Sequence, residues 1–182
     1  MKRTTQQTKR RIREYMKVLV ISDSHGRHDL LRKAIGQEAP IDLLIHAGDV
    51  EGDLDKILGP AREYDVKVVA GNMDRSADMK MSQVFALGGH KVFLTHGHYF
   101  GVSYTKRELR EKAAQCGCDI AIFGHTHTPF MEVQDDILML NPGSVSKPRQ
   151  QGLKKTYAVL TLDERTDKYT VKFKSLKGFG WT

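Results

Sequence analysis

Five short apolar runs in the chain are each followed directly by a polar loop. The runs are rich in β-branched residues, and such runs between polar loops predict strands that are buried on both faces. Each loop holds a glycine beside Asp, Asn or His, and glycine permits tight turns and a close approach of the backbone. The runs span residues 17–21, 41–45, 66–70, 91–95 and 119–123.

Segments with helical spacing of apolar residues lie between these runs. Residues 30–35 predict a first helix with Asp29 as its N-cap, and residues 54–61 and 105–116 predict two more. A strand, loop and helix order that repeats implies parallel strands joined by crossover helices. The second half adds strand patterns at residues 130–133, 137–140, 157–162 and 169–173.

These patterns predict an α/β fold, a four-layer α/β/β/α sandwich of two packed mixed sheets flanked by helices. The length of 182 residues suits one domain, and 40% hydrophobic with 28% charged residues is typical of a globular protein. We expect a basic N-terminal extension over residues 1–16, the domain over 17–176 and a C-terminal tail over 177–182.

The net charge of +7 is concentrated at the N-terminus, where residues 1–17 hold seven Lys and Arg against Glu14 alone. Such an extension could contact RNA or anionic lipid, or be a solvated extension or a segment upstream of a start at Met16. The rest of the chain is nearly neutral. We therefore expect no dedicated nucleic-acid surface on the domain, because grasping a nucleic-acid backbone usually takes a basic face.

Neither membrane insertion nor secretion is indicated. No apolar run approaches the ~20 residues of a membrane helix, and the charged N-terminus lacks the apolar stretch of a signal peptide. Cys116 and Cys118 are too few for a disulfide framework or a structural zinc site. We expect reduced thiols and a cytoplasmic protein.

The loops after the strands carry seven candidate metal ligands. In open α/β sheets the carboxyl ends of the strands converge on one crevice. In extended backbone, residues two apart point the same way. Asp23 with His25, and His125 with His127, could therefore each offer two ligands to one site. Carboxylate with imidazole suits manganese, iron, nickel or zinc. The candidates are Asp23, His25, Asp49, Asn72, His96, His125 and His127.

Taken singly, these signals have ordinary explanations, such as a helix cap, a turn or a buried histidine. Together they resemble the calcineurin-like metallophosphoesterase superfamily, and within it the small single-domain bacterial and archaeal phosphodiesterase branch. The resemblance covers residues 17–173. It rests on Asp23-x-His25, Gly48-Asp49, Gly71-Asn72, His96-Gly97, Gly124-His125-x-His127 and Asn141-Pro142-Gly143-Ser144.

The resemblance implies two divalent metal ions, with manganese the first expectation and iron, nickel or zinc as alternatives. They would acidify a bridging water to hydroxide, neutralise phosphate oxygens and so hydrolyse a small phosphodiester. The family pattern assigns Asp23, His25 and His127 to one metal, Asn72, His96 and His125 to the other, and Asp49 to both.

One position departs from the superfamily. Many members carry a histidine after Gly-Asn that protonates the leaving group, whereas this chain has Met73 followed by Asp74. The branch of small phosphodiesterases often lacks that histidine, so the departure favours the narrower resemblance. We hypothesise a preference for leaving groups that need little protonation, such as aryl groups.

Further candidates lie beside the ligands. His98 is an alternative general acid or a partner of a ligand. Arg149 could hold a phosphate in bidentate fashion or be a solvated surface residue. Asn141 and Ser144 line the site or, as we favour, shape a turn.

Other functions of the same fold stay open at this point. A phosphomonoesterase or a nuclease would use the same metals. A non-catalytic scaffold similar to the retromer small subunit is less favoured, because all seven ligand types are intact here. The natural substrate does not follow from the ligands, and a homo-oligomer is a further alternative.

Overall fold

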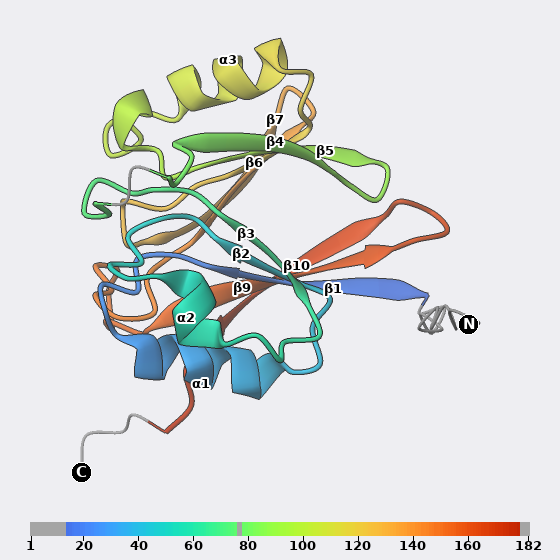
Figure 1. Ribbon diagram of the computed structural model, residues 1–182. Helices are drawn as coiled ribbons and strands as arrows, with labels where there is room; N and C mark the ends of the chain where they lie inside the picture. The colour runs from blue at the N-terminus through green and yellow to red at the C-terminus, as the bar shows by residue number, and fades with distance from the viewer. Residues whose placement is uncertain (1–13, 76–77, 179–182) are drawn as a thin grey trace.

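The structure is a computed structural model that describes residues 14–75 and 78–178 (Figure 1). Two five-stranded sheets pack face to face. Helices α1 (His28–Glu38) and α2 (Leu54–Leu58) cover the outer face of one sheet, and α3 (Arg107–Gln115) covers the outer face of the other. The predicted four-layer α/β sandwich is confirmed.

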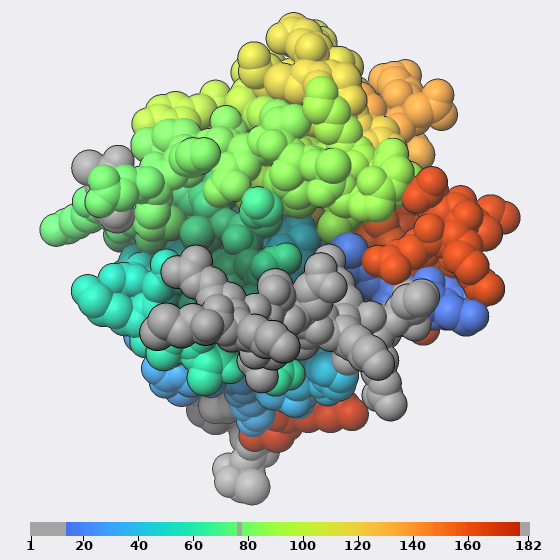
Figure 2. All heavy atoms as spheres, turned by 45° about the vertical axis from the view of Figure 1, so that its right-hand side comes forward, coloured from blue at the N-terminus to red at the C-terminus, as the bar shows by residue number. Residues whose placement is uncertain are grey.

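The first sheet has the strand order β10-β9-β1-β2-β3. Its strands β1, β2 and β3 are parallel, and β9 and β10 are added in antiparallel fashion. In Figure 2 the β9–β10 hairpin, in red, lies beside the start of β1, in blue. The bounds are Tyr15–Ile21 (β1), Leu43–His46 (β2), Asp65–Val68 (β3), Thr156–Asp163 (β9) and Tyr169–Ser175 (β10).

The second sheet has the order β4-β5-β6-β8-β7 and repeats this plan. Strands β5, β6 and β8 are parallel, and the edge strands β4 and β7 are antiparallel to their neighbours. The bounds are Ser82–Leu87 (β4), His90–Thr95 (β5), Ile120–Ile122 (β6), Pro129–Gln134 (β7) and Ile137–Pro142 (β8).

Strand β1 shows why the central strands are apolar throughout. Val18 and Val20 point into the core between the two sheets, whereas Leu19 and Ile21 point into the core beneath α1. All four side chains are fully buried. Side chains alternate across a strand, so a strand covered on both faces needs apolar residues at every position.

Two details differ from the sequence-based expectations. Strand β4 was not predicted, because it is an edge strand whose side chains are mostly exposed or half-buried, which leaves only a weak apolar signal. The prediction that Asp29 is the N-cap of the first helix was wrong. Helix α1 begins two residues earlier than expected, at His28 instead of Leu30, and the Asp29 carboxylate accepts hydrogen bonds from Arg27 at 2.9 and 2.8 Å.

The predicted extensions lie mostly outside the described residues, which begin at residue 14 and end at 178. Strand β1 already starts at Tyr15, opposite Asp163 of β9. The domain boundaries and the role of the basic N-terminal extension therefore stay predictions. Within the described part of the chain, no helix is long and apolar enough to cross a membrane.

Helix α1 contains an exposed glycine whose replacement we expect to stabilise the fold. Gly36 is helical, and an added Cβ would meet no atom within 4 Å. Gly36→Ala should raise the free energy of unfolding by about 0.5–1 kcal/mol, measured by denaturant titration, because alanine loses less backbone entropy in a helix.

Gly59 is the matched control. It also has no atom within 4 Å of an added Cβ, but its φ is +74°. Gly59→Ala should lower stability, since the left-handed conformation strains a residue with a Cβ. Equal effects of the two substitutions would contradict this account.

Candidate metal centre

All seven predicted ligands lie at the carboxyl ends of parallel strands, on loops that gather at the left-hand edge of both sheets in Figure 1. The first sheet supplies four of them after β1, β2 and β3, and the second supplies three after β5 and β6. They are Asp23 and His25, Asp49, Asn72, then His96, and His125 with His127.

The backbone of these loops is not extended, so the expected reason for paired ligands was wrong. Asp23 and His25 have φ values of 55° and 45°, and His125 and His127 have 69° and 59°. A left-handed residue other than glycine is uncommon and costs about 1–3 kcal/mol. Each ligand pair is therefore held by two left-handed residues at positions i and i+2, which the surrounding contacts must enforce.

Hydrogen bonds between loops supply those contacts. The Asp23 N–H donates to the Gly48 carbonyl at 3.0 Å, and the His25 N–H donates to the Asp49 carbonyl at 2.9 Å. The hydroxyls of Ser144 and Ser146 both donate to the Asp23 carbonyl, at 2.8 and 2.7 Å. The Asp23 loop is thus fixed from two sides.

Asn141 is buried and holds the loop that carries the histidine pair. Its Nδ2 donates to the Gly124 carbonyl at 2.7 Å and to Thr126 Oγ1 at 3.1 Å. Its Oδ1 accepts from the Gly143 N–H at 2.9 Å, within the turn that follows β8. Asn141, like Ser144, thus shapes the loops around the site, in line with the alternative that we favoured.

Two of the predicted glycines are required by close packing. A Cβ on Gly71 would lie 2.0 Å from Asp49 Oδ1, and a Cβ on Gly124 would lie 1.9 Å from Ser22 Oγ. Neither distance is tolerable. Any other residue at either position would push the loop beneath a ligand out of place.

Three of the four histidines present Nε2 to the centre because their Nδ1 atoms are occupied. His96 Nδ1 donates to the Ala47 carbonyl at 2.7 Å, and His127 Nδ1 donates to the Lys147 carbonyl at 2.6 Å. A carbonyl oxygen can only accept, so Nδ1 carries the proton and Nε2 of the neutral ring is a bare lone pair. His25 is held in the same way by the Glu51 carboxylate, at 2.5 Å from Nδ1.

These lone pairs and two carboxylates face one another at short range. His25 Nε2 lies 3.2 Å from His127 Nε2, which in turn lies 3.1 Å from Asp23 Oδ1. Asp23 Oδ1 and His96 Nε2 are buried and make no hydrogen bond. Bare electron pairs repel, so this arrangement fits a cation between them. Four residues, Asp23, His25, Asp49 and His127, offer donor atoms within 4.8 Å of one another.

The remaining ligands form a second group beside the first. His125 Nδ1 lies 3.1 Å from Asn72 Oδ1, and the His96 and His125 rings are 5.3 Å apart between centroids. Asp49 stands between the groups, because its Oδ2 is 3.8 Å from His25 Nε2 and 3.4 Å from His96 Nε2. The arrangement is compatible with the division of ligands that the resemblance implies.

The carboxylates are held ionised by their neighbours. Burial raises the pKa of Asp49, but His96 and the Met73 N–H, which donates to Asp49 Oδ1 at 2.8 Å, outweigh it and lower the pKa to about 2. Burial likewise opposes ionisation of Asp23, and His127 and His96 outweigh it, so the pKa of Asp23 is lowered. Burial lowers the pKa of His96, but Asp49 and Asp23 outweigh it and raise that pKa, so a proton on His96 balances part of this charge. A divalent metal would take the place of that proton.

A pocket of about 240 Å³ opens above these ligands. Arg149 lines it, together with Lys147 and Met73, so the structure places the predicted phosphate-binding arginine at the site. His98 does not line it. His98 begins a 3-10 turn (η1, His98–Phe100), and its ring centroid lies 5.4 Å from that of His96.

Three residues of the site were missed in the sequence. Glu51 had a detectable signal, because Asp49-x-Glu51 has the spacing of the other pairs, and both residues are left-handed, with φ of 55° and 53°. Lys147 had none. His46 is fully buried below the site with Nε2 3.0 Å from Ser24 Oγ, and burial lowers its pKa to about 4, so it is uncharged at neutral pH.

Fold and site together define a metallohydrolase-like centre in an α/β sandwich, and comparisons with known proteins identify its class. The model of the calcineurin-like phosphoesterase superfamily domain matches residues 16–165. The chain belongs to this superfamily. Its relatives are named metallophosphoesterases or phosphodiesterases, and the family indicates divalent metals.

Three relatives place the chain more closely. It is 40% identical to the probable metallophosphoesterase YsnB of Bacillus subtilis, over 87% of this chain and 90% of that protein. It is 30% identical to the phosphodiesterase YfcE of Escherichia coli K12, over 74% and 82%. A crystal structure from Streptococcus pneumoniae TIGR4, described as a predicted phosphoesterase, superposes with a TM-score of 0.76 at 30% identity, covering 88% and 90% of the chains.

The Glu51 contact generates a prediction. Glu51→Gln keeps an oxygen acceptor for His25 Nδ1 but removes the negative charge that faces this nitrogen. We expect the affinity for Mn²⁺ to fall about tenfold or more, measured by calorimetric titration of the metal-free protein. Glu63→Gln, at an exposed loop residue, is the control. Equal affinities of the two variants would contradict the role of Glu51.

Proposed function

We propose that the chain is a metal-dependent phosphodiesterase that works with two divalent ions. The observation that carries the proposal is the convergence of His25 Nε2 and His127 Nε2 on the ionised Asp23, whose Oδ1 lies 3.9 and 3.1 Å from them. The relative YfcE, named a phosphodiesterase, supports the type of ester.

In this proposal the residues divide as the family pattern implies. Asp23, His25 and His127 hold one ion, Asn72, His96 and His125 hold the other, and Asp49 contacts both. The ions would supply the positive charge that acidifies water and neutralises phosphate oxygens. Asn72 also borders the pocket and, with Arg149, contacts the phosphate.

Manganese is the metal that we propose first. The donor set consists of imidazole nitrogens with carboxylate and amide oxygens, and no sulfur. Hard and borderline donors of this kind suit manganese, iron, nickel and zinc, whereas an all-oxygen cage would be expected for calcium or magnesium.

The chain's own residues fix the phosphate and leave the leaving group largely unassisted. Arg149 and Lys147 are exposed at the pocket rim, where their charges attract phosphate oxygens. Met73 borders the same pocket and has no proton to give. We therefore propose that esters with acidic leaving groups, such as aryl diesters, are the better substrates.

A phosphomonoesterase is the second candidate, favoured by the two cations at the rim, which would suit a dianionic phosphate. Paired assays on bis(p-nitrophenyl) phosphate and p-nitrophenyl phosphate separate the two. A purely scaffolding role is opposed by the intact ligand set, and a protein that bound no Mn²⁺ and hydrolysed neither ester would favour it.

The bridging carboxylate gives the direct test of the metal centre. Asp49→Asn keeps the shape of the side chain but removes its charge. Asparagine also tolerates the φ of 55° at this position. We expect diester hydrolysis to fall to background and the metal content, measured by elemental analysis, to fall below that of the wild type. Asp136→Asn, at φ of 58° on an exposed turn, is the matched control. Retention of both properties by Asp49→Asn would rule out the assignment.

Met73 tests the leaving-group hypothesis. It is 48% exposed, so substitution should not disturb the core. Met73→His should raise turnover of a dialkyl phosphate relative to bis(p-nitrophenyl) phosphate about tenfold or more, because an added general acid helps only the poorer leaving group. Met73→Gln controls for polarity.

His98 is the alternative acid that we propose for the unmodified chain. If it already supplies the proton, Met73→His brings no gain. His98→Ala then lowers turnover of the dialkyl ester more than that of the aryl ester. Equal losses on both esters would remove His98 from the mechanism.

A further inference from the structure

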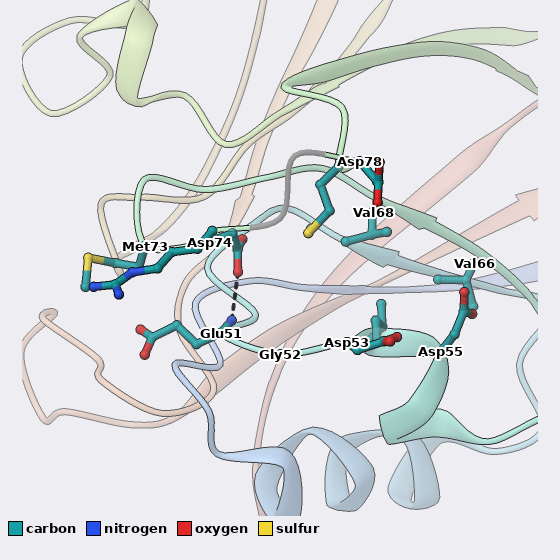
Figure 3. Close-up of a pocket in the computed structure, with 12 residues that line it drawn as sticks. Glu51, Gly52, Asp53, Asp55, Val66, Val68, Met73, Asp74 and Asp78 are labelled. Atoms are coloured by element: carbon teal, nitrogen blue, oxygen red, sulfur yellow. Dashed lines mark hydrogen bonds between the residues drawn. The ribbon is translucent and has the colours of Figure 1, made fainter.

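The pocket above the ligands is small. Its volume of about 240 Å³ includes the space over the metal positions that a phosphate would fill, whereas ligand pockets usually span about 300–1,000 Å³. A bulky ester substituent therefore needs space beyond it. A larger pocket of about 740 Å³ lies next to it, between α2, β3 and the segment around Met73 (Figure 3).

The two pockets share a wall. Met73 lines both, and Glu51 lines the larger pocket while its carboxylate holds His25, which lines the smaller one. Asp74 stiffens this wall, because it accepts from the Glu51 N–H at 2.7 Å, the bond dashed in Figure 3, and from the Gly71 N–H at 2.8 Å. A group that leaves the phosphate over Met73 thus enters the larger pocket directly.

The inner surface of the larger pocket is apolar. Leu54, Val66, Val68 and Met79 line it, and Met73 adds a half-exposed thioether. Methionine adapts to irregular shapes and makes favourable contacts with aromatic rings. Such a surface gains free energy by covering an uncharged ring or compact alkyl group.

The charged residues that line this pocket are mostly carboxylates, which repel anions. Among its described lining residues, five carboxylates stand against one cation, Arg75. Arg62 pairs with Asp55 at 2.6 Å, and Lys56 pairs with Asp53 at 3.0 Å, so part of this charge is balanced. The remainder is negative. The smaller pocket differs, because its rim carries Lys147 and Arg149.

We infer that the larger pocket is the leaving-group site and that it selects phosphodiesters with an uncharged aromatic or compact apolar leaving group. The carboxylates exclude leaving groups that bear an anion, such as the next phosphate of a polynucleotide. The inference rests on the proposed phosphodiesterase activity. It names the substrate class that the metal ligands alone leave open.

Two chromogenic esters test the charge selection. Methyl p-nitrophenyl phosphate and methyl 3-carboxy-4-nitrophenyl phosphate release nitrophenolates of similar acidity, and only the second carries a carboxylate on the leaving group. We expect the wild type to show a kcat/KM at least tenfold higher for the uncharged ester. Repulsion between the carboxylate of the ester and each carboxylate of the pocket should lower kcat/KM about fivefold at intermediate dielectric.

The variant that tests the carboxylates is Asp55→Asn/Asp78→Asn, because both side chains are exposed on the pocket wall. It should raise kcat/KM for the carboxylated ester about tenfold or more and leave the uncharged ester within twofold. Asp136→Asn, outside the pocket, should change neither. An unchanged ratio in the double variant would overturn the inference.

The apolar wall is tested separately. Val68→Thr keeps the shape of a wall residue that is half-buried but replaces a methyl by a hydroxyl. It should raise KM for the uncharged aryl ester about threefold with little change in kcat, since it removes apolar contact and not chemistry. An unchanged KM would count against the pocket.

Different results would contradict the proposed function and the leaving-group site. If the wild type hydrolyses neither ester nor bis(p-nitrophenyl) phosphate with Mn²⁺ present, the proposed function is wrong and the inference falls with it. If it hydrolyses both methyl esters equally well, the function stands and the leaving-group site is wrong.

Discussion

The rest of the structure depends on the burial of negative charge. Asp23 and Asp49 are buried and ionised, and the Nε2 atoms of three histidines face them within 4 Å. Burying charge is costly unless it is paired, so the rest of the fold must hold these groups in place against that cost. A divalent cation would supply the positive charge that pairs with both carboxylates. Metal binding and local stability are therefore coupled at this site.

Backbone groups at the ends of both sheets hold most of these side chains in place. Left-handed residues turn the ligand pairs inward, and carbonyls of Ala47 and Lys147 hold the outer nitrogens of His96 and His127. His25 differs, because a carboxylate takes the place of the carbonyl. Since these three histidines are each fixed by a second contact, the protein itself orients their Nε2 atoms, which favours precise placement of a reacting phosphate.

The loss of a histidine after Asn72 has a structural counterpart. The acid that follows, Asp74, joins the Asp49 loop to the Asn72 loop through two backbone N–H groups. Met73 is left half-exposed on the wall between a basic-rimmed pocket and a larger, acidic one. The position that carries a histidine in many superfamily members is, in this chain, part of the wall between the two pockets. We therefore expect the chain to differ from other superfamily members in its choice of substrate more than in its rate.

The sequence by itself determined the layers of the fold and the set of candidate ligands. Strands buried on both faces leave continuous apolar runs, as in β1, and polar loops follow them, so both features can be recognised without coordinates. Edge strand β4 was not legible, because its partly exposed side chains carry no comparable pattern.

The tertiary structure alone decided how the ligands are aimed and what surrounds them. The left-handed backbone at Asp23 and His125 is imposed by contacts from residues more than a hundred positions away in the chain, such as Ser144 on the Asp23 carbonyl. Glu51, Lys147 and the larger pocket beside Met73 likewise depend on which loops meet in space. Local sequence specifies the donor atoms, but long-range packing sets their direction, because each loop is shaped by a neighbour from another strand.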